Sequence, residues 1–192
     1  MNIAVDMDDV LVDTVLSLNI YHNWCFGTNY EYDDYKDFRL SKVWGGTRDE
    51  VQKKIRHYYR TYFFRELGVC LDAFGAMLVM SQKHKLFVVT SRPKYIEKET
   101  RLFLDCNFKS VFQDVIFTDH CNDGENYKRK KSDVCQELRI DVLFDDCPDY
   151  IHDAAKVVSM VMVPKKPWNR NENFTENNVI LFSRWVDVLE SI

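Results

Sequence analysis

Short apolar stretches that are rich in β-branched residues alternate with longer stretches of mixed character over most of the chain. Stretches of the first kind are typical of buried strands, and the spacing of apolar residues in the second kind is typical of helices. Strands are predicted at residues 3–5, 86–89, 115–117, 142–144, 157–163 and 179–182, and helices at about 71–83, 95–106, 132–139 and 149–156. Strands that alternate with helices in this way predict a parallel sheet with helices on both faces.

One long segment interrupts this alternation, between the first predicted strand and the second. It is mostly helical in pattern and rich in aromatic residues, and at roughly eighty residues it is too long for a single crossover connection. We therefore predict an α/β protein whose Rossmann-like core comprises residues 1–15 and 71–192. Residues 16–70 are predicted to form a small helical cap that is inserted after the first strand.

The composition fits a soluble globular protein with a full core. Of the 192 residues, 46% are hydrophobic and 29% are charged, which is the balance of an ordinary folded domain. The net charge of −4 provides no basic field for holding a nucleic-acid polymer. A small anionic substrate stays compatible with this charge, because a metal ion and a few local Lys or Arg residues can neutralise it.

Neither a membrane segment nor a disulfide framework is predicted. No apolar run is long enough to span a bilayer, and the first residues become acidic at once instead of forming a signal peptide. The six cysteines are scattered without a C-x-x-C pair. We therefore expect free thiols in a reducing, cytoplasmic compartment, with three disulfides as the alternative.

Polar side chains follow several of the predicted strands. In parallel α/β sheets, ligands bind beyond the carboxyl ends of the strands, so these side chains are expected to face one site. The set consists of Asp6 and Asp8 after the first strand, Thr90, Ser91 and Arg92 after the second, and Asp145 and Asp146 after the strand at 142–144, with Lys130 and Lys131 at the start of the preceding helix.

These residue types together favour phosphoryl chemistry. Carboxylates that lie close together repel each other unless a cation sits among them, and an all-oxygen ligand set is what Mg²⁺ prefers. Hydroxyl, backbone N–H and ammonium groups stabilise the charge on a phosphoryl group during transfer. One Asp can attack phosphorus, and a second can exchange protons with the leaving group and with water.

In this order the residues resemble the motifs of the haloacid dehalogenase superfamily of phosphatases. Residues 6–10 (DMDDV) match its nucleophile loop, Thr90 its second motif, a lysine its third, and residues 145–146 (DD) its fourth. The match extends over nearly the whole chain. The resemblance implies Mg²⁺-dependent hydrolysis of a phosphomonoester through a phosphoaspartate intermediate.

Finer features are similar to the 5'(3')-deoxyribonucleotidase branch of that superfamily. They are VDMDDVLVD at residues 5–13, Gly75-Ala76, KSDVC at 131–135 followed by Ile140-Asp141, Pro148-Asp149, and PWNR at 167–170. Two positions depart from the expected pattern: Asp9 stands where many of these phosphatases have Gly, a variant also seen in this branch, and Phe74 stands where Pro is expected. The resemblance implies a nucleoside monophosphate as the substrate, with the deoxypyrimidine types resting on it alone.

The resemblance also implies a role for each matched residue. Asp6 attacks phosphorus and ligates Mg²⁺. Asp8 is the general acid and base, and its main-chain carbonyl ligates the metal. Thr90 and the backbone near Ser91 hold phosphoryl oxygens.

The remaining motifs supply charge. Lys131 neutralises Asp6 and the phosphoryl group, with Lys130 as the fallback because the basic run at 128–131 blurs the register. Asp146 ligates the metal and Asp145 supports it, although the two roles can be exchanged.

Aromatic residues of the predicted cap are candidates for stacking on a nucleobase. Trp24, Phe26 and Trp44 are favoured because they lie near Gly-containing loops, whereas most rings of a small cap are expected to form its core. Arg92 is a further candidate for contact with the substrate or with the residues that bind it.

Other functions are left open. A phosphatase of another small metabolite, such as a sugar phosphate, or a phosphotransferase would use the same residues. A catalytically silent binding module would predict a damaged motif, and none is visible. A receiver domain is set aside because it needs neither the Asp6–Asp8 pair nor a cap. A homodimer is a possible assembly.

Overall fold

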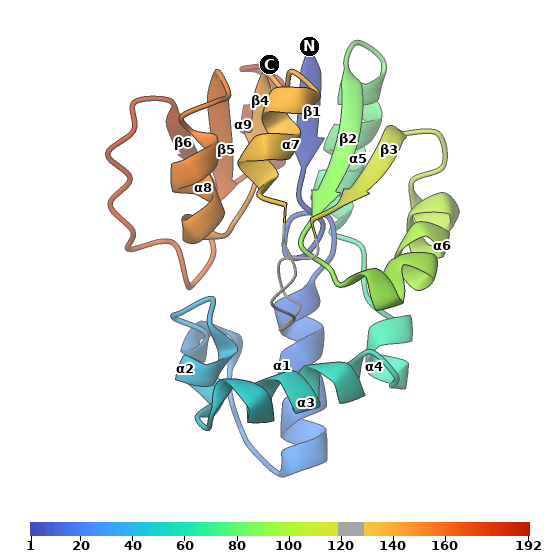
Figure 1. The fold of residues 1–192 in the computed structure, drawn as a ribbon, viewed down its shortest axis with the longest axis vertical. Coiled ribbons are helices and arrows are strands. Elements are labelled where there is room, and N and C mark those ends of the chain that lie inside the picture. The colour runs from blue at the N-terminus through green and yellow to red at the C-terminus, as the bar shows by residue number, and fades with distance from the viewer. Residues whose placement is uncertain (119–128) are drawn as a thin grey trace.

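The computed structural model of the chain describes residues 1–118 and 129–192, and its core is a six-stranded parallel sheet (Figure 1). The strand order is β3-β2-β1-β4-β5-β6, so the first strand lies inside the sheet. The strands are β1 (Asn2–Val5), β2 (Lys85–Thr90), β3 (Phe112–Phe117), β4 (Val142–Phe144), β5 (Met160–Pro164) and β6 (Val179–Phe182). The predicted α/β class with a Rossmann-like parallel sheet is confirmed.

Helices cover both faces of the sheet. Successive strand residues point to opposite faces, and the core is accordingly divided into two apolar clusters. Ile3 and Val5 belong to the larger cluster, which also holds residues of the helices on one face, α5 (Leu71–Ser81), α6 (Glu97–Asn107) and α9 (Trp185–Leu189). Ala4 belongs to the smaller cluster, with residues of α7 (Lys131–Glu137) and α8 (Pro148–Ala154) on the other face (Figure 1).

The predicted strands and helices of the core are all present, but two strand boundaries differ by three residues and helix α9 was not predicted. Strand β3 begins at Phe112, earlier than the predicted start at 115, because Gln113 and Asp114 are exposed polar residues that break the apolar run. The strand predicted at 157–163 begins only at Met160, because Val157 and Val158 lie in the turn after α8. Both valines pack with the smaller apolar cluster, so their apolar character comes from packing under the sheet and not from a strand. Helix α6 begins at Glu97, after a single 3₁₀ turn at Lys94–Ile96.

A group of helices fills the long segment between β1 and β2. These are α1 (Thr14–Phe26), the 3₁₀ turn η1 (Tyr32–Asp34), α2 (Leu40–Trp44), α3 (Arg48–Tyr58) and α4 (Tyr62–Arg65). They lie beyond the carboxyl ends of the strands, as the blue and cyan ribbons of Figure 1 show. We call residues 14–65 the helical segment; its treatment as a cap with boundaries at 16 and 70 stays a prediction.

A partly buried chain of polar side chains holds the far end of α1 in the helical segment. The ammonium of Lys54 donates to Nε2 of His22 at 2.9 Å, so the Nδ1–H of His22 donates to the Thr28 hydroxyl at 2.8 Å. That hydroxyl in turn donates to the Asn23 side chain at 2.8 Å. The His22 ring also stacks on Trp44, with 4.4 Å between ring centroids. These contacts require a neutral imidazole, and burial and Lys54 together lower the pKa of His22 to about 4.

Two expectations from composition can be compared with the structure. Five cysteines in the described part of the chain are free thiols, namely Cys25, Cys70, Cys106, Cys135 and Cys147, whereas Cys121 lies outside it. Among the helices of the same residues, none has the length and apolar character needed to cross a membrane. The cytoplasmic location stays a prediction.

Candidate functional site

The nucleophile candidate Asp6 directly follows β1 at the carboxyl edge of the sheet. Its backbone N–H donates to the Phe144 carbonyl at 2.8 Å, which extends the pairing of β1 with β4 by one residue. The chain then turns sharply, with the N–H groups of Leu11 and Val12 both donating to the Met7 carbonyl at 2.9 and 3.1 Å. Inside this turn Asp9 adopts a left-handed conformation, with φ of 59°. Such a φ is easiest for Gly and is tolerated by Asp, which accounts for both residue types at this position.

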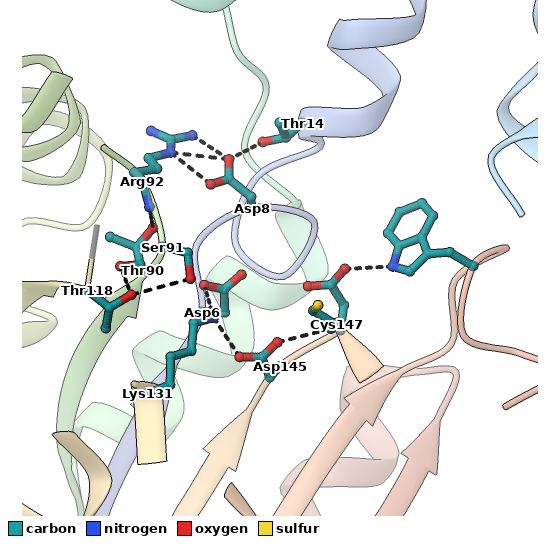
Figure 2. A network of polar contacts seen from close by, with 12 residues as sticks. Asp6, Asp8, Thr14, Thr90, Ser91, Arg92, Thr118, Lys131, Asp145 and Cys147 are labelled. Carbon is teal, nitrogen blue, oxygen red and sulfur yellow. Dashed lines mark hydrogen bonds and ion pairs between the residues drawn. The ribbon is translucent and has the colours of Figure 1, made fainter. Parts of the chain in front are cut away.

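Lys131 lies between two buried carboxylates. Its ammonium donates to Oδ1 of Asp6 and to Oδ2 of Asp145, each at 2.6 Å (Figure 2). Burial alone would lower the pKa of Lys131, but Asp145 and Asp6 outweigh it and raise the pKa well above its ordinary value. Lys130 instead pairs with Asp153 at 2.9 Å on the surface. The structure therefore places Lys131, and not Lys130, in the cluster with Asp6.

Three carboxylates at this edge form a fitting site for a divalent cation. Asp6, Asp145 and Asp146 are buried, and each offers an oxygen within 4.8 Å of the others. Lys131 supplies one positive charge, so a net charge of about −2 remains to be balanced when all three are ionised. Burial raises the pKa of Asp6 to about 7, and burial with the neighbouring carboxylates raises that of Asp146 well above its ordinary value. An all-oxygen donor set with this charge suits Mg²⁺.

Hydroxyl groups gather on the other side of Asp6. Thr90, the last residue of β2, is fully buried, and its hydroxyl accepts the N–H of Arg92 at 3.1 Å. The Thr90 carbonyl accepts the backbone N–H of Thr118 at 2.9 Å. The Thr118 hydroxyl lies 3.4 Å from that of Ser91, and both side chains lie beside Asp6 in Figure 2. The hydroxyls of Ser91 and Thr118 thus lie beside Asp6, and the role of Thr90 and Ser91 in phosphoryl binding stays a prediction.

Asp8 is held by a buried arginine. Arg92 donates from Nη2 to Oδ1 of Asp8 at 2.7 Å and from Nε to Oδ2 at 3.0 Å, and the Thr14 hydroxyl also donates to Oδ1. Burial alone would raise the pKa of Asp8, but the charge and hydrogen bonds of Arg92 outweigh it and hold the pKa below its ordinary value. Arg92 is further fixed by Thr100 at 3.3 Å and by the Phe64 ring.

The aromatic residues that were expected to touch the substrate are not brought to this cluster. Trp24 and Phe26 lie at the far end of α1, about 15 Å along the helix from Thr14, which contacts Asp8. Trp24 is 81% exposed to solvent. Trp44 is buried against His22, and its indole N–H donates to the Tyr35 hydroxyl at 3.0 Å. These rings lie away from the cluster because α1 points away from the sheet and Trp44 packs within the helical segment, and their contact with a substrate stays a prediction.

Several residues near the site were given no role from the sequence, although Trp168 belongs to the PWNR run at 167–170. Trp168 donates its indole N–H to Asp146 at 2.8 Å, and Tyr150 lies with its ring 4.6 Å from the ammonium of Lys131. Tyr150 and Lys131 line a cavity of about 180 Å³. Thr118 follows the strand predicted at 115–117, so the strand-end rule could have found it. No comparable signal marks Tyr150.

Comparison with known proteins adds to this geometry. No family model matches the chain. A curated relative, "Putative nucleotidase OB0422" from Oceanobacillus iheyensis, is 22% identical over 178 residues and covers 90% of each chain. A haloacid dehalogenase-like hydrolase, SP0104 from Streptococcus pneumoniae, matches in structure with a TM-score of 0.71 at 13% identity, over 99% of this chain and 97% of that one. The fold is that of the haloacid dehalogenase-like hydrolases.

A second solved structure of the haloacid dehalogenase fold adds a metal. The HAD-hydrolase YfnB from Bacillus subtilis, described as bound to magnesium, matches with a TM-score of 0.64 at 14% identity, over 99% of this chain and 97% of that chain. Both structural matches include the helical segment, because they cover nearly the whole of each protein. The likeness of the chain to haloacid dehalogenase-like proteins that was inferred from its motifs is therefore confirmed at the level of the fold.

Proposed function

We propose that the protein is a Mg²⁺-dependent phosphatase that transfers a phosphoryl group to Asp6 and then to water. The observation that carries the proposal is the buried cluster in which Lys131 bridges Asp6 and Asp145 at 2.6 Å, with Asp146 alongside. It lies at the carboxyl edge of a parallel sheet, where ligands bind in this architecture. The haloacid dehalogenase fold and the magnesium bound by YfnB support the same reading.

Asp6 is the nucleophile in the proposed reaction. Its carboxylate oxygen forms a bond to phosphorus while the ester P–O bond breaks, and the leaving alkoxide takes a proton from Asp8. Lys131 holds Oδ1 of Asp6 and thereby orients the carboxylate before the substrate arrives. Asp8 then takes a proton from water as the water oxygen bonds to phosphorus and the bond to Asp6 breaks, which yields inorganic phosphate.

The remaining groups stabilise charge. Mg²⁺ held by Asp6, Asp145 and Asp146 would offset the negative charge of the phosphoryl oxygens. The hydroxyls of Thr90, Ser91 and Thr118 lie on the opposite side of Asp6, where they can donate to the same oxygens. Fixed donors of this kind need no rearrangement during the reaction, which is why they lower the barrier.

We propose a nucleoside monophosphate as the substrate. The curated relative named as a nucleotidase supports this class, and so do the sequence features shared with the 5'(3')-deoxyribonucleotidase branch. A sugar phosphate or another small phosphomonoester is the alternative, since the same cluster would act on it. Tyr150 is the aromatic residue placed beside Lys131 that could meet the leaving group.

The test is release of inorganic phosphate from a panel of ribo- and deoxyribonucleoside monophosphates and sugar phosphates. Each assay is run with Mg²⁺ and with EDTA, and Asp6→Asn is compared with Asp187→Asn, an aspartate in α9 that pairs with Arg184 on the surface. Release that needs Mg²⁺, is confined to nucleotides and is lost only in Asp6→Asn is the expected result. Release from sugar phosphates alone would contradict the substrate class, and undiminished release by Asp6→Asn would contradict the mechanism.

A further inference from the structure

Asp146 is held at both its side chain and its main chain by the turn that follows β5. Trp168 donates its indole N–H to Oδ2 of Asp146 at 2.8 Å. Asn169 donates from Nδ2 to the Asp146 carbonyl at 2.9 Å and to the Pro164 carbonyl at 3.0 Å. Trp168 is 5% exposed and Asn169 is fully buried, so these hydrogen bonds are shielded from water.

The hydrogen bond from Trp168 has two physical consequences for Asp146. A single N–H on a rigid ring can donate in one direction only, so it fixes the rotation of the carboxylate and thus the direction of Oδ1. It also ties the position of Asp146 to the turn after β5, because Trp168 holds its side chain while Asn169 holds its main chain.

The same turn touches the helical segment. The Trp168 ring packs edge to face on Tyr32 of η1, with 6.0 Å between ring centroids. Arg170 lies 3.5 Å from Asp33 of the same 3₁₀ turn. Trp168 therefore contacts both a candidate metal ligand and the helical segment.

We propose that Trp168 is a positioning residue for the metal ligand Asp146 and that its contact with Tyr32 links this ligand to the helical segment. The inference rests on the metal site of the proposed function. It predicts that removing the indole N–H weakens the binding of Mg²⁺ itself, before any substrate is present. Donors that orient a metal ligand typically change metal affinity by about 10–100-fold when they are removed.

The test measures the Mg²⁺ affinity of the full chain by calorimetry, after EDTA treatment and without substrate. Trp168→Phe keeps a ring against Tyr32 and removes only the indole N–H, and a loss of about tenfold or more is expected. Trp44→Phe is the matched control, because Trp44 is 7% exposed and also donates its indole N–H to one side chain, Tyr35, within the helical segment. Equal Mg²⁺ affinity of the two variants would overturn the proposal.

The link to the helical segment has its own variant. Tyr32→Leu removes the ring contact without touching the hydrogen bond to Asp146, and Mg²⁺ affinity is expected to fall by about twofold or more, as for the loss of one aromatic pair. An unchanged affinity would overturn the link while leaving the role of the indole N–H intact.

A measurement on the unaltered protein covers the case in which a variant does not fold. The chain has four tryptophans, so its indole N–H resonances can be assigned one by one through single substitutions. On titration with Mg²⁺, the Trp168 resonance is expected to shift and the Trp44 resonance to stay. No shift of the Trp168 resonance would contradict the proposal, as would a wild-type chain that binds no Mg²⁺. Because no step requires turnover, loss of Mg²⁺ binding in Trp168→Phe would support it even if no phosphate is ever released.

Discussion

The guanidinium of Arg92 donates to both carboxylate oxygens of Asp8, to Oδ1 at 2.7 Å and to Oδ2 at 3.0 Å. Arg92 is buried, with 3% of its surface exposed to solvent. In this arrangement Asp8 is ionised, which suits a base that takes a proton from water. A proton donor to the leaving group needs the opposite state. The ion pair with Arg92 must therefore open, or be weakened by the incoming phosphate, before Asp8 can act as the acid.

Removing the charge of Arg92 should raise the pKa of Asp8. In Arg92→Gln the side chain can still donate a hydrogen bond, but the positive charge is lost, and an upward change of about one pH unit or more is expected. The measurement is an NMR titration of the side-chain carboxyl carbons, with the Asp8 signal assigned through Asp8→Asn. Arg101→Gln is a control, because Arg101 pairs with Glu97 on the surface of α6. An Asp8 pKa that is equal in Arg92→Gln and the wild type would contradict the role of the ion pair.

The left-handed conformation of Asp9 predicts a specific order of stability. Its carboxylate accepts the N–H of Val15 near the start of α1 at 3.0 Å, while its φ of 59° strains a residue with an ordinary side chain. Asp9→Asn keeps an oxygen that can accept the Val15 N–H, and Asn tolerates a positive φ. Asp9→Ala loses this hydrogen bond, and Ala is strained at the same φ. Since neither variant carries the charge, Asp9→Ala should be less stable than Asp9→Asn by about 2 kcal/mol in urea unfolding. Equal midpoints would refute this reading of the turn.

The core of the fold could be predicted because its central strands are buried on both faces. Strands such as residues 142–144 read as uninterrupted apolar runs, and this composition leaves few alternatives. The boundary at Val157 could not be predicted, because a valine that packs under the sheet looks the same in sequence as a valine within a strand.

The candidate site was predictable where residues follow strands and not where they come from loops and turns. Asp6, Thr90 and Asp145 each follow or end a strand, so the topology of a parallel sheet brings them together. Arg92 was a candidate by the same rule, but its pairing with Asp8 and that of Trp168 with Asp146 depend on how a turn is folded, and no periodicity encodes that. The distance of Trp24 from the cluster could not be predicted for the same reason, since the direction of α1 away from the sheet is a tertiary property.

The acidic cluster predicts how stability depends on pH without metal. The pKa of Asp6 is raised to about 7 in the folded chain, so between about pH 4 and 7 the folded state binds a proton that the unfolded state has released. The free energy of unfolding should therefore fall as pH rises through this range, relative to Asp6→Asn, which cannot titrate there. Thermal unfolding in EDTA across pH 4–7 measures the difference between the two proteins.

Bound Mg²⁺ should remove this fall in the free energy of unfolding between about pH 4 and pH 7. A cation bound among Asp6, Asp145 and Asp146 replaces the proton and stabilises the ionised cluster. With saturating Mg²⁺, the unfolding temperature of the wild type should rise most near pH 7 and little near pH 4. A rise of equal size in Asp6→Asn would show that the ion binds elsewhere.

His22 predicts the opposite slope. Its pKa in the folded chain is lowered to about 4. Between about pH 6.5 and pH 4, the imidazole is therefore protonated in the unfolded state and neutral in the folded state. The stability that His22 contributes is therefore present above pH 6.5 and is lost as pH falls toward 4. The difference in unfolding free energy between the wild type and His22→Gln measures it. A difference that does not change with pH would contradict the neutral, Lys54-bound imidazole.

The central claim is that Asp6 carries the phosphoryl group during turnover. The most direct measurement uses a nucleoside monophosphate with a ³²P-labelled phosphate, quenched in acid within the first turnover, followed by peptide mapping. We predict label on the peptide that contains Asp6, labile to alkali and absent in Asp6→Asn. Phosphate release by the wild type with label on another residue, or continued release by Asp6→Asn, would contradict the account.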